Sequence, residues 1–303
     1  MTRVLALFGP TAVGKTGVAI SLAERLRERG EDPAAVNCDS IQVYRGLETL
    51  SGAASEAERE RLEHRLLSFV EPAEEFSAGR YAEVAHAEID SLLAEGRRPI
   101  VVGGTGLYLR AALSNLDLRP PVPQEIRDRV EREMAERGAA ALHAELDPDL
   151  AQTVDPNDRK RIARLTELAR AGIEAAPDSE RLWTAELRHP TLLVGITLDR
   201  EELARRIDAR VDEMIAVGAA EEVRAAAEAG PSRTARAALG FETLLADIDG
   251  SPSQETIEGI KASHRAYARR QLTWMRRMEG VRLIDRTGRS DEGVADEIMA
   301  RIG

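Results

Sequence analysis

The chain has 303 residues, of which 43% are hydrophobic and only 3% aromatic, so a core would be aliphatic. Its formal net charge of −11 argues against nucleic-acid binding unless basic residues cluster locally. Cys38 is the single cysteine, which excludes an internal disulfide, and no apolar run approaches the roughly 20 residues that span a bilayer. The N-terminus does not resemble a secretory signal. We therefore expect a soluble cytoplasmic protein with no membrane segment.

The first predicted elements surround a phosphate-binding motif. Residues 3–8 are typical of a strand, and a helix is expected over about 16–29. Between them, GPTAVGKT fits G-x-x-x-x-G-K-[ST], in which the loop amides and the lysine bind a phosphate and the final hydroxyl ligates Mg²⁺. The flanking strand and helix argue against a chance glycine-rich turn. The expected phosphate-binding residues are Gly9, Pro10, Thr11, Ala12, Val13, Gly14, Lys15 and Thr16, with Thr16 as the metal ligand.

Two further strand ends carry candidate site residues. A strand ending near Cys38 places Asp39 where α/β sheets hold catalytic groups, although an Asp-Ser turn explains the same residues. A strand over 99–102 is followed by two glycines that would let the backbone approach a ligand, and then by Thr105. The Thr105 hydroxyl could face the site or could cap the next helix.

The order of elements predicts an α/β fold with an insertion. Alternating strands and helices indicate a parallel sheet with helices on both faces. A proline-rich break, NLDLRPPVP, precedes a purely helical and charged stretch from about 124 to 187. A strand near 191–198, a long helix near 254–278 and a final short strand, VRLID, follow. We therefore expect a core of residues 1–120 and 189–303, interrupted by an all-helical domain of residues 121–188.

Basic residues concentrate in two predicted helices. In KASHRAYARRQLTWMRRM, helical spacing would bury apolar and amide side chains and turn most of the basic ones outward. The expected buried residues are Ile260, Tyr267, Gln271, Trp274 and Met278. The basic ones are Lys261, Arg265, Arg269, Arg270, Arg276 and Arg277. In DRKRIARLTELAR, the same spacing places Lys160, Arg161 and Arg164 on one side and Ile162, Leu165 and Leu168 inward. Each run fits either a solvated face or an RNA surface.

Five motifs in this order resemble the tRNA dimethylallyltransferases, also called tRNA isopentenyltransferases. They are GPTAVGKT, DSIQVYRG, VVGGTGLYL, DPNDRKRIAR and RRQLTWMR, and the resemblance runs over nearly the whole chain. The resemblance implies that the loop holds the diphosphate of dimethylallyl diphosphate, with Mg²⁺. The prenyl group would go to the exocyclic amine (N6) of the adenosine 3′-adjacent to the anticodon. The inserted helices would help to bind the tRNA anticodon stem-loop, and the family's manner of binding requires no partner chain, so we expect a monomer.

The resemblance also assigns residues. Asp39 matches the proposed general base, Thr105 would lie near the bridging oxygen, and Lys15 and Arg210 would hold the diphosphate. From its own sequence, EELARRIDARVDEM, Arg210 would instead lie on a solvated helix face. The residues matching tRNA-contacting positions are Asp39, Ser40, Ile41, Gln42, Thr105, Arg127, Lys160, Arg161, Ile162, Ala163, Arg164, Arg270, Gln271 and Trp274.

The chain departs from the resemblance in two places, and other functions remain open. After VYRG the family usually continues Gly-Thr-Ala-Lys-Pro, whereas this chain has LETLSGAASEAE; the stretch AALGFETL also differs. A P-loop kinase or NTPase would need a metal-binding Asp after a core strand, for which Asp199 is the candidate. An isopentenyltransferase acting on free adenine nucleotide would not need the insertion. A nucleic-acid-binding module would not explain Lys15 and Thr16.

Overall fold

A computed structural model describes residues 3–116, 118–174, 183–247 and 251–302. The chain divides into two compact units, one built from residues up to 115 and from 183 onward, the other from residues 116–182. The second boundary lies a few residues before the expected one because Trp183 already packs on the core. Its ring lies 4.8 Å from that of Trp274, and its carbonyl accepts a hydrogen bond of 3.1 Å from the Glu279 amide.

Six parallel strands form the sheet of the first unit, in the order β3-β2-β4-β1-β5-β6. The predicted parallel sheet is thus confirmed, while the two-residue β3 was not foreseen. The strands are β1 (Val4–Phe8), β2 (Pro33–Asn37), β3 (His64–Arg65), β4 (Arg98–Gly103), β5 (Thr191–Thr197) and β6 (Arg282–Asp285). All five residues of β1 are buried, as expected of a strand covered on both sides.

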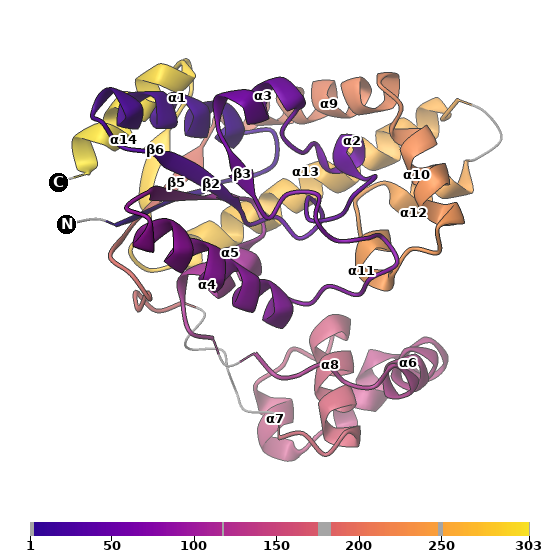
Figure 1. Cartoon of the computed structure of the whole chain (residues 1–303). Helices are drawn as coiled ribbons and strands as arrows, with labels where there is room; N and C mark the ends of the chain where they lie inside the picture. The colour runs from indigo at the N-terminus through magenta and orange to yellow at the C-terminus, as the bar shows by residue number, and fades with distance from the viewer. Residues whose placement is uncertain (1–2, 117, 175–182, 248–250, 303) are drawn as a thin grey trace. The chain divides into compact units, whose positions relative to one another are not determined.

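Helices cover both faces of the sheet, as the sequence predicts (Figure 1). On one face, α1 (Lys15–Glu28) packs against α14 (Asp291–Arg301); on the other, α4 (Ala78–Ala94) packs against α5 (Gly106–Leu113). The core between strands and helices is aliphatic. It includes Val18, Leu22 and Leu26, which follow one another at the four-residue spacing of a single helix face.

Further helices of the first unit surround the carboxyl edge of the sheet. Two short ones that the sequence analysis missed are α2 (Glu48–Ser51) and α3 (Glu56–Arg61). Ser55 and Glu58 form a capping box at the start of α3, a signal that was present in the sequence. The others are α9 (Arg200–Ala216), α10 (Ala219–Glu228), α11 (Arg233–Arg236), α12 (Phe241–Ala246) and α13 (Gln254–Arg277).

The second unit is helical throughout its described elements. These are α6 (Gln124–Ala144), α7 (Pro148–Gln152) and α8 (Arg159–Arg170). α6 breaks at Gly138, whose φ of 80° and ψ of 167° lie outside the helical region, so it consists of two helical segments. The helices of this unit share a small hydrophobic core, which is formed by Val130, Met134, Leu142, Val154 and Ile162. Of the helical stretch expected up to residue 187, residues 171–174 and 183–187 are not helical, and residues 175–182 lie outside those described. Across the described residues, no helix is long and apolar enough to cross a membrane.

Candidate active site

The phosphate loop folds back on its own lysine. Lys15 begins α1, and its Nζ donates hydrogen bonds of 3.0 and 2.9 Å to the carbonyls of Gly9 and Pro10. Burial, together with the Arg210 guanidinium, lowers the pKa of Lys15 to about 8, although Asp39 opposes the shift. The charged form of Lys15 is therefore disfavoured here, and a bound anion would stabilise it.

Two side chains from the C-terminal part of the chain fix the loop from outside. Gln271 of α13 accepts a 2.8 Å hydrogen bond from the Thr11 amide, and Arg286 donates one of 2.6 Å to the Val13 carbonyl. Arg286 is itself buried and paired with Asp291 at 2.9 Å. The sequence analysis missed Arg286, because nothing in its local sequence marks it as a partner of a loop far away in the chain.

Arg210 reaches the same loop, so its expected placement on a solvated helix face is wrong. Its Nη1 lies 3.4 Å from Thr11 Oγ1, and its Nη2 donates to the carbonyls of Ser51 and Gly52 at 3.1 and 3.0 Å. Burial lowers the pKa of Arg210, while Asp39 acts in the opposite direction. Arg210 turns inward next to Val211, which is buried, so this charged side chain lies beside the apolar face of α9.

The segment that departs from the family pattern provides these carbonyls. A Cβ on Gly52 would lie 1.7 Å from Arg210 Nη2, and Gly52 has a φ of +60°, so both the close contact and the backbone favour glycine. The amide Nε2 of Gln42 also donates to the Gly52 carbonyl, at 3.1 Å. The carbonyls of Ser51 and Gly52 thus bind Arg210, although this segment lacks the lysine of the family pattern.

Asp39 follows β2 and is held by a network of short polar contacts. Its Oδ1 accepts a 3.0 Å hydrogen bond from the Ile41 amide, so the predicted Asp-Ser turn does form. Asn37 accepts a hydrogen bond from the Asp39 amide at 3.2 Å and donates to the Leu66 carbonyl at 3.0 Å. The turn uses one carboxylate oxygen, and among the described residues the other, Oδ2, has no hydrogen-bond partner. Turn and proton acceptor are therefore compatible roles.

Thr105 faces the site. It occupies the N-cap position of α5, yet its side chain makes no capping hydrogen bond. Its Oγ1 instead accepts a 3.2 Å hydrogen bond from the Ser40 amide and lies 3.4 Å from the Tyr267 hydroxyl. The alternative of a helix cap is wrong for this hydroxyl, which links the loops after β2 and β4.

The two glycines before Thr105 approach protein atoms. A Cβ on Gly103 would lie 2.5 Å from the Cys38 carbonyl carbon, and one on Gly104 would lie 2.2 Å from Gln271 Nε2. Their small size lets β2 and α13 come close to β4, while the expected approach of a ligand to these glycines stays a prediction.

The basic residues of α13 divide into two groups. Lys261 is buried and paired with Asp212 of α9 at 2.8 Å, and Arg265 is paired with Asp208 of α9. These two are exceptions to the expected outward placement of most of the basic residues, because acids on a neighbouring helix neutralise them. The four others are exposed, namely Arg269, Arg270, Arg276 and Arg277.

The predicted buried residues of α13 are partly confirmed. Ile260, Gln271 and Met278 are buried, whereas Tyr267 and Trp274 are half-buried. Gln271 was also expected to contact tRNA, but it is 3% exposed and its Nε2 donates to the Gly104 carbonyl at 2.7 Å.

In the second unit, the candidate tRNA-binding residues of α8 differ in their exposure to solvent and in their hydrogen bonds. Lys160 and Arg161 are exposed, while Ile162 is buried, as its inward position predicted. Arg164 donates to the carbonyls of Arg119 and Pro120 at 3.2 and 2.8 Å. The remaining two candidates are half-buried, Ala163 on α8 and Arg127 on α6, and Arg127 donates to the Val122 carbonyl at 3.0 Å.

The remaining candidates lie in the first unit. Ser40, Ile41 and Gln42 are half-buried directly beside Asp39. In the second divergent stretch, Phe241 is buried and Glu242 accepts a 2.7 Å hydrogen bond from Arg236 Nε.

The Thr16 side chain fits a magnesium ion that is also held by ligand oxygens. Its hydroxyl makes no hydrogen bond within the described part of the chain. Over the same residues, no group of three or more His, Cys, Asp or Glu side chains could hold a metal. A single hydroxyl at a helix start suits Mg²⁺, which takes oxygen ligands and retains several from substrate and water.

Asp199 does not provide the metal carboxylate of a nucleotide hydrolase. Its Oδ1 caps α9 by accepting hydrogen bonds of 2.9 and 3.0 Å from the amides of Glu201 and Glu202. These backbone donors lower the pKa of Asp199. Since β4, the other neighbour of β1, ends in glycines and Asp199 caps α9, neither flanking strand is followed by a carboxylate without a structural role.

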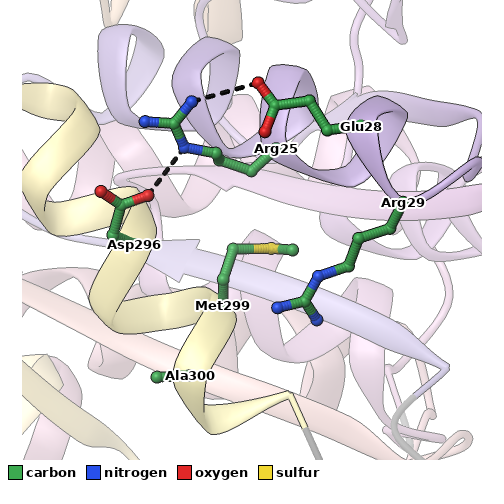
Figure 2. A pocket seen from close by; sticks show the side chains of 6 residues that line it. All are labelled: Arg25, Glu28, Arg29, Asp296, Met299 and Ala300. Atoms are coloured by element: carbon green, nitrogen blue, oxygen red, sulfur yellow. Dashed lines mark hydrogen bonds and ion pairs between the residues drawn. The ribbon is translucent and has the colours of Figure 1, made fainter.

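A surface depression elsewhere contains none of these residues. Figure 2 shows it between the last turn of α1 and α14, where Arg25 bonds Asp296 at 2.7 Å and Glu28 at 3.2 Å. It lies at the far end of α1, roughly 15 Å along the helix from Lys15. The depression is therefore separate from the candidate site at the N-terminal end of this helix.

The comparisons agree with this geometry. Residues 42–278 match the family model described as IPP transferase. A tRNA dimethylallyltransferase of Anaeromyxobacter sp. (strain Fw109-5) is 42% identical over 289 residues, which is 94% of this chain and 95% of the relative. One of Acetivibrio thermocellus is 37% identical over 307 residues, covering 98% and 95%.

Two solved structures extend the likeness. A tRNA isopentenylpyrophosphate transferase from Bacillus halodurans has a TM-score of 0.72 at 30% identity, over 100% of this chain and 96% of that one. A eukaryotic dimethylallyltransferase described as acting on tRNA has a TM-score of 0.78 at 25% identity, over 99% and 78%. The fold and site define a P-loop group transferase. The chain belongs to the IPP transferase family.

Proposed function

We propose that this protein transfers the dimethylallyl group from dimethylallyl diphosphate to N6 of the adenosine 3′-adjacent to the anticodon in tRNA, releasing diphosphate. The observation that supports it best is the convergence of Lys15, Arg210 and Thr105 with Asp39 at the carboxyl edge of the sheet. Cations for a leaving diphosphate and a carboxylate for an amine proton are the two requirements of prenyl transfer. Family membership supports the same reaction.

The leaving group is stabilised by the loop side of the site. As the allylic carbon–oxygen bond breaks, the diphosphate takes the electron pair and gains negative charge. Lys15 then exchanges its bonds to the Gly9 and Pro10 carbonyls for the diphosphate, and Arg210 stabilises it beside Thr11. Thr16 would hold Mg²⁺, which neutralises part of this charge when bound. The Thr105 hydroxyl would donate to the bridging oxygen.

The acceptor side needs a proton acceptor. An aromatic amine is a weak nucleophile, and its attack on the allylic carbon forms the carbon–nitrogen bond and leaves a proton to be removed. The carboxylate oxygen of Asp39 that is not used in the turn can accept it. To reach this position, the adenine must leave its stack.

Each unit presents exposed basic residues that suit the RNA backbone. In the first unit these are the four exposed arginines of α13, and in the second they include Lys160 and Arg161. Local clustering reconciles the acidic net charge with a polyanionic substrate. We infer that the unit of residues 116–182 is a tRNA-binding domain and that the protein acts as a cytoplasmic monomer.

The test is a transfer assay with labelled dimethylallyl diphosphate, Mg²⁺ and unmodified tRNA, with AMP and ATP in parallel. Label in tRNA alone, at the adenosine next to the anticodon, is the expected result. Label in AMP would move the acceptor to a free nucleotide. ATP hydrolysis without any transfer would contradict the proposal and favour a P-loop NTPase.

A further inference from the structure

One buried amide joins α13 to two loops of the site. Gln271 Oε1 accepts from the Thr11 amide at 2.8 Å, and Gln271 Nε2 donates to the Gly104 carbonyl at 2.7 Å. The side chain is 3% exposed, so both bonds are shielded from water. Thr11 belongs to the phosphate loop, and Gly104 directly precedes Thr105, so a single side chain sets the spacing of the diphosphate and acceptor sides.

The packing around Gln271 leaves little freedom. A Cβ on Gly104 would lie 2.2 Å from Gln271 Nε2, and one on Gly106 would lie 2.4 Å from the Trp274 ring. One turn earlier, the Tyr267 hydroxyl lies 3.4 Å from Thr105 Oγ1. The inward side of α13 therefore contacts the phosphate loop and the β4–α5 loop at successive turns.

The outward side of the same helix segment is cationic. Arg270 lies 5.4 Å above the Tyr267 ring, and Arg277 lies 4.3 Å above the ring of Trp183. Arg269 and Arg276 are also exposed. Residues adjacent in sequence thus point to the site and to solvent: Arg270 is exposed while Gln271 is buried.

We infer that Gln271 is a positioning residue that couples the cationic face of α13 to the diphosphate loop. A polyanion that favours this placement of α13 also favours this placement of the Thr11 amide, and a diphosphate in the loop favours the same placement of the helix. By thermodynamic reciprocity, each ligand then raises the affinity for the other by the same factor. The identity of the two ligands rests on the proposed function; the coupling through Gln271 is the new element.

The inference is tested with two probes that cannot react together, inorganic diphosphate with Mg²⁺ and an unmodified anticodon stem-loop RNA. Calorimetric titration gives the Kd of diphosphate without and with saturating RNA in the full-length protein. We expect the RNA to tighten diphosphate binding by about fivefold or more in the wild type. In Gln271→Met, which keeps the length of the side chain but loses both hydrogen bonds, the factor should fall to about one.

Two further variants separate coupling from general damage. Gln271→Glu keeps the acceptor for the Thr11 amide but loses the donor to Gly104, so its factor should lie between the other two. Gln254→Met makes the same substitution at an exposed position on the same helix, where Nε2 bonds Glu258, and should behave as the wild type. A thermal unfolding scan accompanies each variant.

The outcomes are distinct. A factor near one in the wild type, or an equal factor in the wild type and Gln271→Met, would overturn the coupling while leaving the transferase function intact. Failure of the wild type to bind either probe would overturn both. Loss of coupling in Gln271→Met with coupling preserved in Gln254→Met establishes it.

Discussion

The cations of the diphosphate site and those on the outer face of α13 are held in opposite ways. Backbone carbonyls bind Lys15 and Arg210 in surroundings that lower the pKa of both. Arg269 and Arg276 extend into solvent from a helix surface. Each of these two cations has one position and one set of partners, so each substitution should have a specific effect. The surface cations contribute through their number, so single losses should be small and salt-dependent.

The largest effect should come from substituting Asp39, the carboxylate that shares the site with Lys15 and Arg210. Asp39→Asn keeps the acceptor of the Ile41 amide and so keeps the turn, but it cannot take a proton. We expect kcat to fall roughly 10²- to 10⁴-fold while tRNA affinity stays within a few-fold, as measured by single-turnover transfer and RNA titration. Asp199→Asn, another carboxylate beyond a strand end, should leave both unchanged because Asn caps a helix equally well. Equal loss of kcat and RNA affinity in Asp39→Asn would make Asp39 a positioning residue.

The pH dependence of diphosphate binding tests the buried lysine. Free Lys15 has a pKa of about 8, and a bound anion raises it, so binding takes up a proton above that pH. Affinity should be constant below about pH 8 and should fall by up to about tenfold per pH unit above it, until the higher pKa of the complex is reached. In Lys15→Arg the side chain stays charged at every pH, so any fall in affinity that remains comes from titration of the diphosphate. The part of the fall that is seen only in the wild type comes from Lys15. Identical profiles in the two proteins would refute the role of Lys15.

The contact between Arg210 and Gly52 should be sensitive to a single methyl group. Gly52→Ala places a Cβ 1.7 Å from Arg210 Nη2, so the guanidinium must move, and diphosphate affinity should fall by about tenfold. Gly46→Ala is the matched control: Gly46 has a φ of +67°, but nothing lies within 4 Å of its Cβ. Both variants should lose about 1 kcal/mol of unfolding free energy from backbone strain. Equal diphosphate affinity in both would show that Gly52 does not position Arg210.

The smallest effect should distinguish the two groups of cations on α13. The double variant Arg269→Ala/Arg276→Ala should weaken RNA binding only several-fold and lower the slope of log Kd against log salt by about two. Lys261→Ala/Arg265→Ala removes the same charge from residues paired with Asp208 and Asp212, and its salt slope should not change. If both doubles lowered the slope equally, net charge rather than placement would govern RNA binding.

The sequence predicted those elements and site residues that a short motif or the spacing of neighbouring residues marks. The phosphate motif, the buried face of α1 and the strand ends at Asp39 and Thr105 follow from spacing and composition within short windows. The position of Arg210 could not be predicted in this way. Its helix has an acceptable solvated face, and only the carbonyls of Ser51 and Gly52, far away in sequence, turn it inward.

The same limit explains the errors on α13. Helical spacing identified a long amphipathic helix, but it could not show that acids of α9 neutralise Lys261 and Arg265. Asn37 was missed although it stands two residues before Asp39, a spacing at which Asn commonly bonds the backbone. That signal was present in the sequence and could have been used.

Two hydrogen bonds that hold the phosphate loop join residues far apart in the chain, and this affects when the loop forms during synthesis. Val13 and Arg286 are 273 residues apart, and Thr11 and Gln271 are 260 apart. A chain emerging during synthesis can form β1 and α1 early, but it cannot complete the loop until these late residues arrive. The full support of the phosphate loop therefore forms late, after most of the chain has been synthesised.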